Sequence, residues 1–279
     1  MPRSKDLNLP YILAFIMIPC ATEFDAVNGQ EADQKATLTH ALKLAADGDT
    51  FQAFDFLESR YRPPQVVELY SQLVRRIYAE KKDIPLMLAF GRQGISVALR
   101  DARRLEADDR ETSQLLLGTA KSIAYNLGSN TWPGWDEPGI VLTRSDIAFG
   151  VDAAVLNLRL GNELRRGPEA MGNAYWLIGA HHLSGRRTAP ALEAFTAANV
   201  EFARADKPDY VLMTAGYLAL TRRLVEETRE AGTVELQRAL AELQQSPSDD
   251  AKFFAEQIQT AERALLRQFA IEAGDKPLQ

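Results

Sequence analysis

Residues 175–203, with the sequence YWLIGAHHLSGRRTAPALEAFTAANVEFA, contain the pattern that decides the fold. The stretch predicts two amphipathic helices joined by a short turn at Gly185-Arg186-Arg187. Its small residues are Gly179, Ala191 and Ala198, and its aromatic residues are Tyr175, Trp176 and Phe195. Antiparallel helices approach closely only where one side lacks bulk, so we expect small residues of one helix to face large residues of the other.

This spacing resembles the tetratricopeptide (TPR) repeat, in which an aromatic residue and a leucine-glycine pair precede an alanine, a bulky residue and a second alanine. The residues in register are Tyr175, Ile178, Gly179, Ala191, Phe195 and Ala198. His182 stands where the family has an aromatic residue, and Ala203 replaces the closing proline. The resemblance implies stacked helix pairs, but it is nearly silent on function because helical repeats bind many kinds of partner.

Helix boundaries continue the pattern along the chain. The predicted helix starts lie at Pro63-Pro64, at Asp83 before Ile84-Pro85, and at Thr143 with Asp146 three residues later. From Pro168 onward, breaks recur about every twenty residues, and no stretch alternates in the manner of a strand. We therefore predict an all-α fold, an α-α superhelix built as a stack of antiparallel helix pairs (a TPR-like solenoid).

Charge and length limit the possible classes of protein. A net charge of −6 and a pI near 5.3 argue against a nucleic-acid partner, which would require a basic patch. The 279 residues are enough for a large core, and no long polar linker divides them. We predict one continuous helical-repeat domain over residues 36–273, followed by a tail over 274–279.

The N-terminus differs from the rest of the chain. Residues 1–21 form a signal-like apolar leader, because basic residues precede a run that is too short to span a bilayer, and residues 22–35 form a polar linker. Cleavage after Ala21, lipidation of Cys20, and packing of the leader on the domain are all open, although Pro19 fits neither processing pattern well. We expect an exported or periplasmic bacterial protein, with a cytoplasmic one as the alternative. Membrane association requires that the leader is retained or Cys20 is lipidated.

The TPR resemblance also implies a ligand-binding face. In the family, the first helix of each pair lines a concave surface, and the matching positions here include Asn173 and Trp176. Aligning the next helix through Gly216 adds Tyr210 and Met213. Asn173 is suited to hydrogen bond with a peptide backbone, and Trp176 to bury an apolar side chain of a partner, with a place in the core as its alternative.

An irregular stretch over residues 128–143 gives a second candidate site. Pro133-Gly134 fits the centre of a type II turn, which would place Trp132 beside Trp135, and Pro138-Gly139 fits a second turn just beyond. Together with Asp136, the two indoles are suited to hold an apolar or cationic group. The alternative is that they fill a gap between helix pairs.

The sequence contains no catalytic motif: there is no phosphate-binding glycine loop, nucleophile elbow or paired-histidine zinc helix. His181 and His182 are adjacent, so on a helix they point about 100° apart and cannot chelate one ion together. We expect His182 to pack inside the pair and His181 to lie nearer the surface. No catalytic residue, metal or cofactor is predicted.

Three functional hypotheses follow. The first is a non-enzymatic helical-repeat module that mediates protein or peptide binding. The second is an enzyme or small-molecule-binding protein that uses the 128–143 loop over a helical cavity. The third is a purely structural subunit of an assembly.

Overall fold

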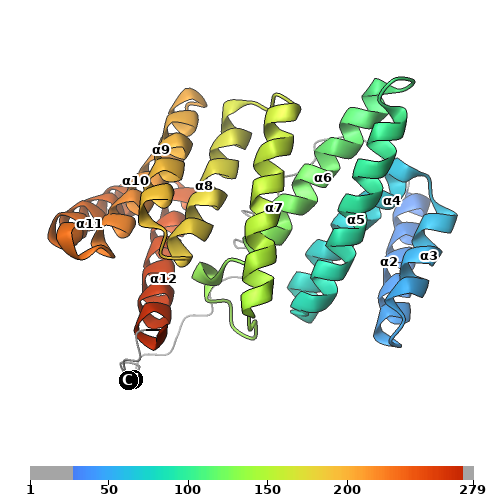
Figure 1. Ribbon diagram of the computed structural model, residues 1–279, viewed down its shortest axis with the longest axis horizontal. Coiled ribbons are helices and arrows are strands. Elements are labelled where there is room, and N and C mark those ends of the chain that lie inside the picture. The colour runs from blue at the N-terminus through green and yellow to red at the C-terminus, as the bar shows by residue number, and fades with distance from the viewer. Residues whose placement is uncertain (1–27, 273–279) are drawn as a thin grey trace. The chain divides into compact units, whose positions relative to one another are not determined.

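The computed structural model describes residues 28–272, and within them the chain forms eleven α-helices and no strand (Figure 1). This confirms the prediction of an all-α fold in which neighbouring helices pair. Contacts group the chain into two compact units, Met1–Asn130 and Thr131–Gln279, where the sequence predicted one continuous domain. The predicted leader, its cleavage position and Cys20 lie outside the described residues, so export stays a prediction.

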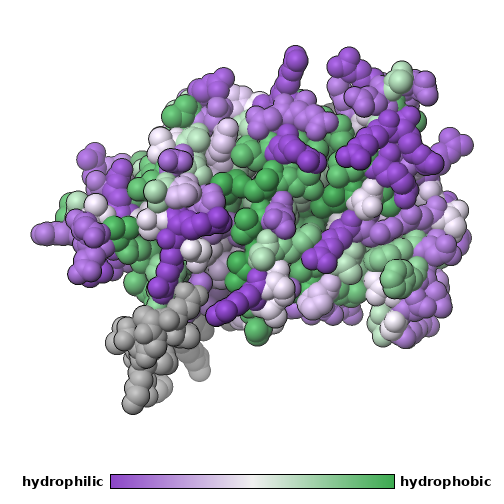
Figure 2. All heavy atoms as spheres, in the orientation of Figure 1, coloured by the Kyte–Doolittle hydropathy of each residue, from purple (hydrophilic) through white to green (hydrophobic). Residues whose placement is uncertain are grey.

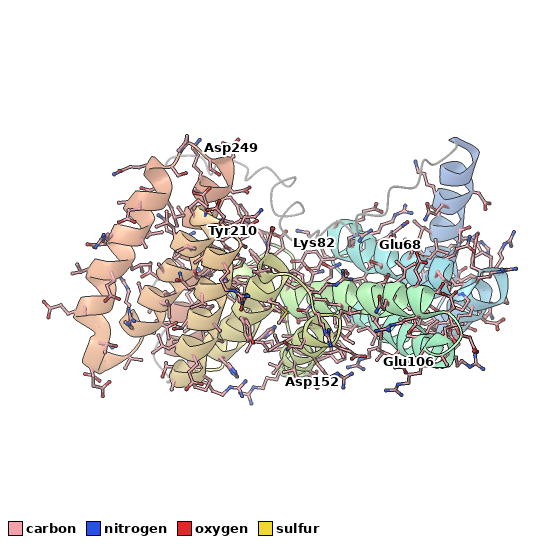
Figure 3. All side chains as sticks on the ribbon, turned by 90° about the horizontal axis from the view of Figure 1, so that it is seen from above. Glu68, Lys82, Glu106, Asp152, Tyr210 and Asp249 are labelled. Atoms are coloured by element: carbon pink, nitrogen blue, oxygen red, sulfur yellow. The ribbon has the colours of Figure 1, made fainter. Side chains whose placement is uncertain are left out.

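The first unit contains five α-helices and one π-helical turn. They are α2 (Asn28–Ala46), α3 (Thr50–Arg60), α4 (Pro63–Arg76), η1 (Ile77–Lys81), α5 (Ile84–Leu105) and α6 (Arg110–Asn130). The first helix begins eight residues before the predicted start at Ala36, inside the segment predicted as a polar linker. Glu106 marks the bend between α5 and α6, where the sequence predicted a break near Asp108 (Figure 3).

Helix starts in this unit follow the predicted chemistry. The Asp83 carboxylate accepts a hydrogen bond of 2.9 Å from the backbone N–H of Leu86, as a capping residue does. Pro63 and Pro64 occupy the first turn of α4, where a missing N–H costs nothing.

Two glycines of α5 allow α4 and α6 to pack close to it. A Cβ added at Gly91 would lie within 2.6 Å of the Leu127 side chain on α6. One added at Gly94 would lie 2.6 Å from the Cβ of Tyr70 on α4. Both glycines therefore serve close contact between helices.

The second unit contains six α-helices and two short 3₁₀ turns. They are η2 (Pro133–Trp135), α7 (Arg144–Glu163), α8 (Pro168–Ser184), α9 (Thr188–Arg204), α10 (Pro208–Arg223), η3 (Glu226–Thr228), α11 (Arg229–Gln245) and α12 (Asp249–Glu272). The predicted capping box at the start of α7 is present: the Asp146 carboxylate accepts from the Thr143 N–H at 2.8 Å, and the Thr143 hydroxyl accepts from the Asp146 N–H at 3.2 Å.

The α8–α9 pair has the close packing that the quoted stretch predicts. A Cβ at Gly179 would lie 2.7 Å from carbons of the Phe195 ring, and one at Gly172 would lie 2.8 Å from the Phe202 ring. The second contact lies seven residues earlier on α8 and seven later on α9, as antiparallel helices require. Glycine on one helix therefore makes room for phenylalanine on the other at two successive levels.

Candidate binding surfaces in the second helical unit

The predicted tryptophan loop packs against α8 and buries Trp132. Trp132 and Trp135 contact each other edge to face, with ring centroids 5.3 Å apart. The Trp132 side chain is only 1% exposed, and its Nε1–H donates a 3.0 Å hydrogen bond to the carbonyl of Ala180 on α8. Because a buried indole N–H that lacks a partner is costly, this bond fixes the loop on α8.

The two predicted turns have different outcomes. Pro138-Gly139 makes the predicted second turn, and the φ of 84° at Gly139 and the 3.1 Å hydrogen bond from the N–H of Ile140 to the carbonyl of Glu137 are those of type II. The type II prediction for Pro133-Gly134 is wrong, because these residues form the 3₁₀ turn η2 and Gly134 does not have a positive φ. Glycine is needed at 134 for another reason: a Cβ there would collide with the Trp132 ring.

The two tryptophans of the loop belong to an aromatic cluster, which we define as Trp132, Trp135, Trp176, Tyr217 and Phe195. Trp176 of α8 lies 5.6 Å from Trp132 and 5.6 Å from Tyr217 of α10, centroid to centroid. Phe195 of α9 stacks on Tyr217 at 5.2 Å. The cluster thus joins η2 to three helices, and Trp132 and Trp176 are buried within it.

The four positions that the TPR resemblance assigned to a ligand face do not form an open groove. We call them the inner face: Asn173, Trp176, Tyr210 and Met213. Trp176 and Met213 are fully buried, Asn173 is buried and Tyr210 is half-buried. The face is covered by the chain itself, because Phe254 of α12 lies 4.9 Å from Tyr210 and η2 packs on Trp176. A partner cannot contact Trp176 or Met213 in this conformation.

Asp136, the third residue of the predicted loop site, is exposed and already paired. Its carboxylate lies 2.6 Å from the guanidinium of Arg267 on α12. Asp136 has a φ of 50°, in the left-handed region that ends the 3₁₀ turn. The predicted grouping of Trp132, Trp135 and Asp136 is therefore present, but the structure directs it toward α12.

Open apolar surface lies elsewhere in this unit, in two furrows. The α8–α9 furrow has a volume of about 560 Å³, and its apolar lining includes Tyr175, Leu192, Ala197 and Val200. Val200 is 53% exposed, and Glu193 and Glu201 form the acidic rim. In the view of Figure 2, apolar side chains likewise come to the surface in patches among charged ones.

The α10–α11 furrow has a volume of about 300 Å³. Leu212, Ala215 and Leu218 of α10 line it together with Ala239 of α11. Two ion pairs form its rim, Arg222 with Glu235 at 2.5 Å and Arg238 with Glu242 at 2.8 Å. The sequence analysis missed both furrows, although half-exposed apolar residues at helical spacing, outside the packing positions, were a signal that could have identified them.

The two neighbouring histidines have the opposite placement from the one expected. His181 is buried, and a Cβ added at Gly150 of α7 would lie 2.8 Å from its ring. His182 is only half-buried, and burial followed by the nearby Arg187 charge lowers its pKa, while Glu193 acts in the opposite direction. The prediction was wrong because the repeat pattern describes contacts within the α8–α9 pair, whereas α7 is what covers His181.

Ionisable residues gather in the first unit as well, around Glu58 of α3. Its carboxylate accepts hydrogen bonds from the Tyr70 hydroxyl at 3.0 Å and from the Gln93 amide at 2.5 Å. Burial, reinforced by the Glu58 charge, raises the pKa of Tyr70. A phenol whose pKa is raised is a weaker acid, so this arrangement stabilises the fold and does not prepare Tyr70 for proton transfer.

Within residues 28–272, no group of three or more histidine, cysteine, aspartate or glutamate residues is placed to hold a metal ion. None of the helices in that range is both long and apolar enough to cross a membrane. The chain matches no protein-family model, no curated protein and no solved structure. The two furrows and the surfaces around them are therefore the candidate binding surfaces of this unit.

Proposed function

We propose that this protein is a non-enzymatic helical-repeat module that binds a protein or peptide partner, and that α8 and α9 form a TPR-like pair within it. The observation that carries the proposal is the solvent-exposed apolar lining of the two furrows, one on each of two successive helix pairs. Tyr175 lines the first furrow and Leu212 the second, and these two residues are 37 residues apart, as are Gly179 and Gly216.

The chemistry of the furrows suits a polypeptide better than a small molecule. Each is open and shallow, with apolar residues along its floor and charges along its rim. Small-molecule sites are generally concave enough to bury most of the ligand, whereas protein interfaces combine an apolar centre with a polar rim. The alternative of a small-molecule or enzyme site on the 128–143 loop gains no support from Trp132, whose indole is buried and hydrogen-bonded.

Matched charge insertions in the full chain test the proposal. A partner captured by the wild-type protein is identified by mass spectrometry, and its dissociation constant is then measured by titration with the purified partner. We expect Val200→Glu or Leu218→Glu to weaken binding by about tenfold or more, because each places a charge in an apolar contact. Val234→Glu is the control, since Val234 is 63% exposed and lines neither furrow.

Equal binding by all three variants would show that the furrows are not the site. Capture of no polypeptide, together with turnover of a small molecule that loop variants abolish, would favour the enzyme hypothesis instead.

A further inference from the structure

The C-terminal helix α12 lies along α10 as a bound helix would, and it covers Tyr210 of the inner face. It runs in the same direction as α10, and Figure 3 shows their beginnings, at Tyr210 and Asp249, near one edge of the unit. Phe254 contacts Tyr210, and Ile258 lies so close to Gly216 that a Cβ there would be 2.6 Å from its Cδ1.

Farther along, charged and polar contacts hold α12 in place. Glu262 pairs with Arg223 at the end of α10, at 2.7 Å. The Gln268 amide donates to the carbonyl of Ser184, the last residue of α8, at 3.2 Å. Arg267 pairs with Asp136 beside η2. The helix therefore crosses from the start of α10, at Tyr210, to the end of α8, at Ser184.

The contacting residues of α12 form one apolar stripe. They are Ala251, Phe254, Ala255, Ile258, Ala261 and Leu265, all buried. Their spacing of three and four residues is that of an amphipathic helix laid into a groove. The surface of α10 that α12 covers thus accommodates a helix, and the two helices come closest at Gly216.

One buried residue of α12, Gln257, lacks hydrogen-bond partners for its side chain. Gln257 is only 5% exposed, yet neither its Nε2 nor its Oε1 has a hydrogen-bond partner. A buried amide without partners has lost its hydrogen bonds to water and forms none with the protein. Gln257 therefore weakens the packing of α12. Only the non-helical residues Ser246-Pro247-Ser248 connect α12 to α11, so the helix can detach without unwinding its neighbour.

We propose that the face of α10 that carries Tyr210, Gly216 and Arg223 is a helix-binding site and that α12 is its intramolecular occupant. The partner is an amphipathic helix with the apolar spacing of α12, an acidic residue to meet Arg223 and a basic residue to meet Asp136. This goes beyond the furrow-based function, because the α10–α11 furrow uses other residues of α10, namely Leu212, Ala215 and Leu218, and the α8–α9 furrow uses none.

Labelled synthetic peptides with the α12 sequence, residues 249–272, test this on the full-length protein by fluorescence anisotropy. The wild-type peptide must compete with a tethered α12 at high effective concentration, so its binding is weak. A Gln257→Leu peptide removes the unpartnered amide and binds about tenfold more tightly. An Ile258→Asp peptide carries a charge into the Gly216 contact and does not bind. Because only the peptides are altered, the protein itself is the same in all of these measurements.

A reversible disulfide between α12 and α10, which we call the lock, supplies the second test. In a Cys20→Ser background, Gly216→Cys with Ile258→Cys joins α12 to α10, since a Cβ at 216 would lie 3.6 Å from the Cγ1 of Ile258. The oxidised protein should not bind the peptides. Reduction should restore binding of an Ile258→Ala peptide, whose shorter side chain leaves room for the Gly216→Cys side chain.

Several outcomes would overturn the proposal: equal binding of the Ile258→Asp peptide, binding to the oxidised lock, or no peptide binding even after reduction. The last would show that α12 is a permanent part of the core. Val200→Glu and Leu218→Glu should leave peptide binding unchanged, so failure of the furrow function and failure of the helix site are distinguishable.

Discussion

The ring of Phe195 lies so close to Gly179 that no larger residue fits between α8 and α9 without movement of one helix. Two ring carbons would be 2.7 Å from a Cβ at 179, well inside van der Waals contact. The contact has a partner at Gly172 and Phe202, and Phe195 in turn stacks on Tyr217 of the next helix. A change at Gly179 is therefore expected to spread from the pair into the aromatic cluster.

We expect Gly179→Leu to lower the free energy of unfolding by about 1–3 kcal/mol, because overpacking forces side chains off their rotamers or separates the helices. The measurement is the midpoint of urea denaturation followed by circular dichroism. Gly167→Ser is the control: a Cβ there meets nothing within 4 Å, and serine caps a helix well. An unchanged midpoint for Gly179→Leu would contradict the close register of α8 and α9.

The three tryptophans should differ in their access to solvent. Trp132 and Trp176 are buried, whereas Trp135 is half-buried. In variants that retain a single tryptophan, we expect acrylamide to quench Trp135 the most and the other two as little as core residues. Free quenching of Trp132 would show that the loop is open and would revive the predicted site on it.

Stability should fall at alkaline pH because of Tyr210. Burial, followed by the charges of Asp250, Glu169 and Asp209, raises its pKa to about 12 from the ordinary tyrosine value of 10.0. Between these values the folded protein keeps a proton that the unfolded chain has lost, so the stabilisation is complete below pH 10 and disappears as the pH rises through 12. Tyr210→Phe should flatten this part of the stability profile, measured by urea denaturation at several pH values. An unchanged slope would mean that the Tyr210 phenol titrates normally.

Local signals in the sequence predicted the elements well. Pro63-Pro64, Asp83 and Thr143 begin helices as expected, because capping and the fixed φ of proline act within one turn. The contact between Gly179 and Phe195 was also predictable, since both residues belong to one helix pair. At Pro133-Gly134 the same local logic failed, because packing of the Trp132 ring on the turn decides its shape.

The candidate site depended on contacts that no local pattern contains. Nothing in the spacing of residues 249–272 says that this helix covers Tyr210 and crosses to Ser184. For the same reason the sequence left Trp176 open between a ligand-binding face and the core, and it predicted His181 near the surface. Each of these residues is buried by an element outside its own pair.

The final prediction concerns the two units. Because contacts concentrate within Met1–Asn130 and within Thr131–Gln279, a local strain should be relieved by opening of the unit that contains it. Gly94→Leu presses on Tyr70 in the first unit, and Gly179→Leu presses on Phe195 in the second. Native-state hydrogen exchange with mass spectrometry should show faster exchange in α4–α6 for the first variant and in α8–α10 for the second. Each variant is the control for the other, since both insert the same side chain at a helical glycine. Faster exchange throughout the chain in either variant would show instead that the two units unfold as one cooperative structure.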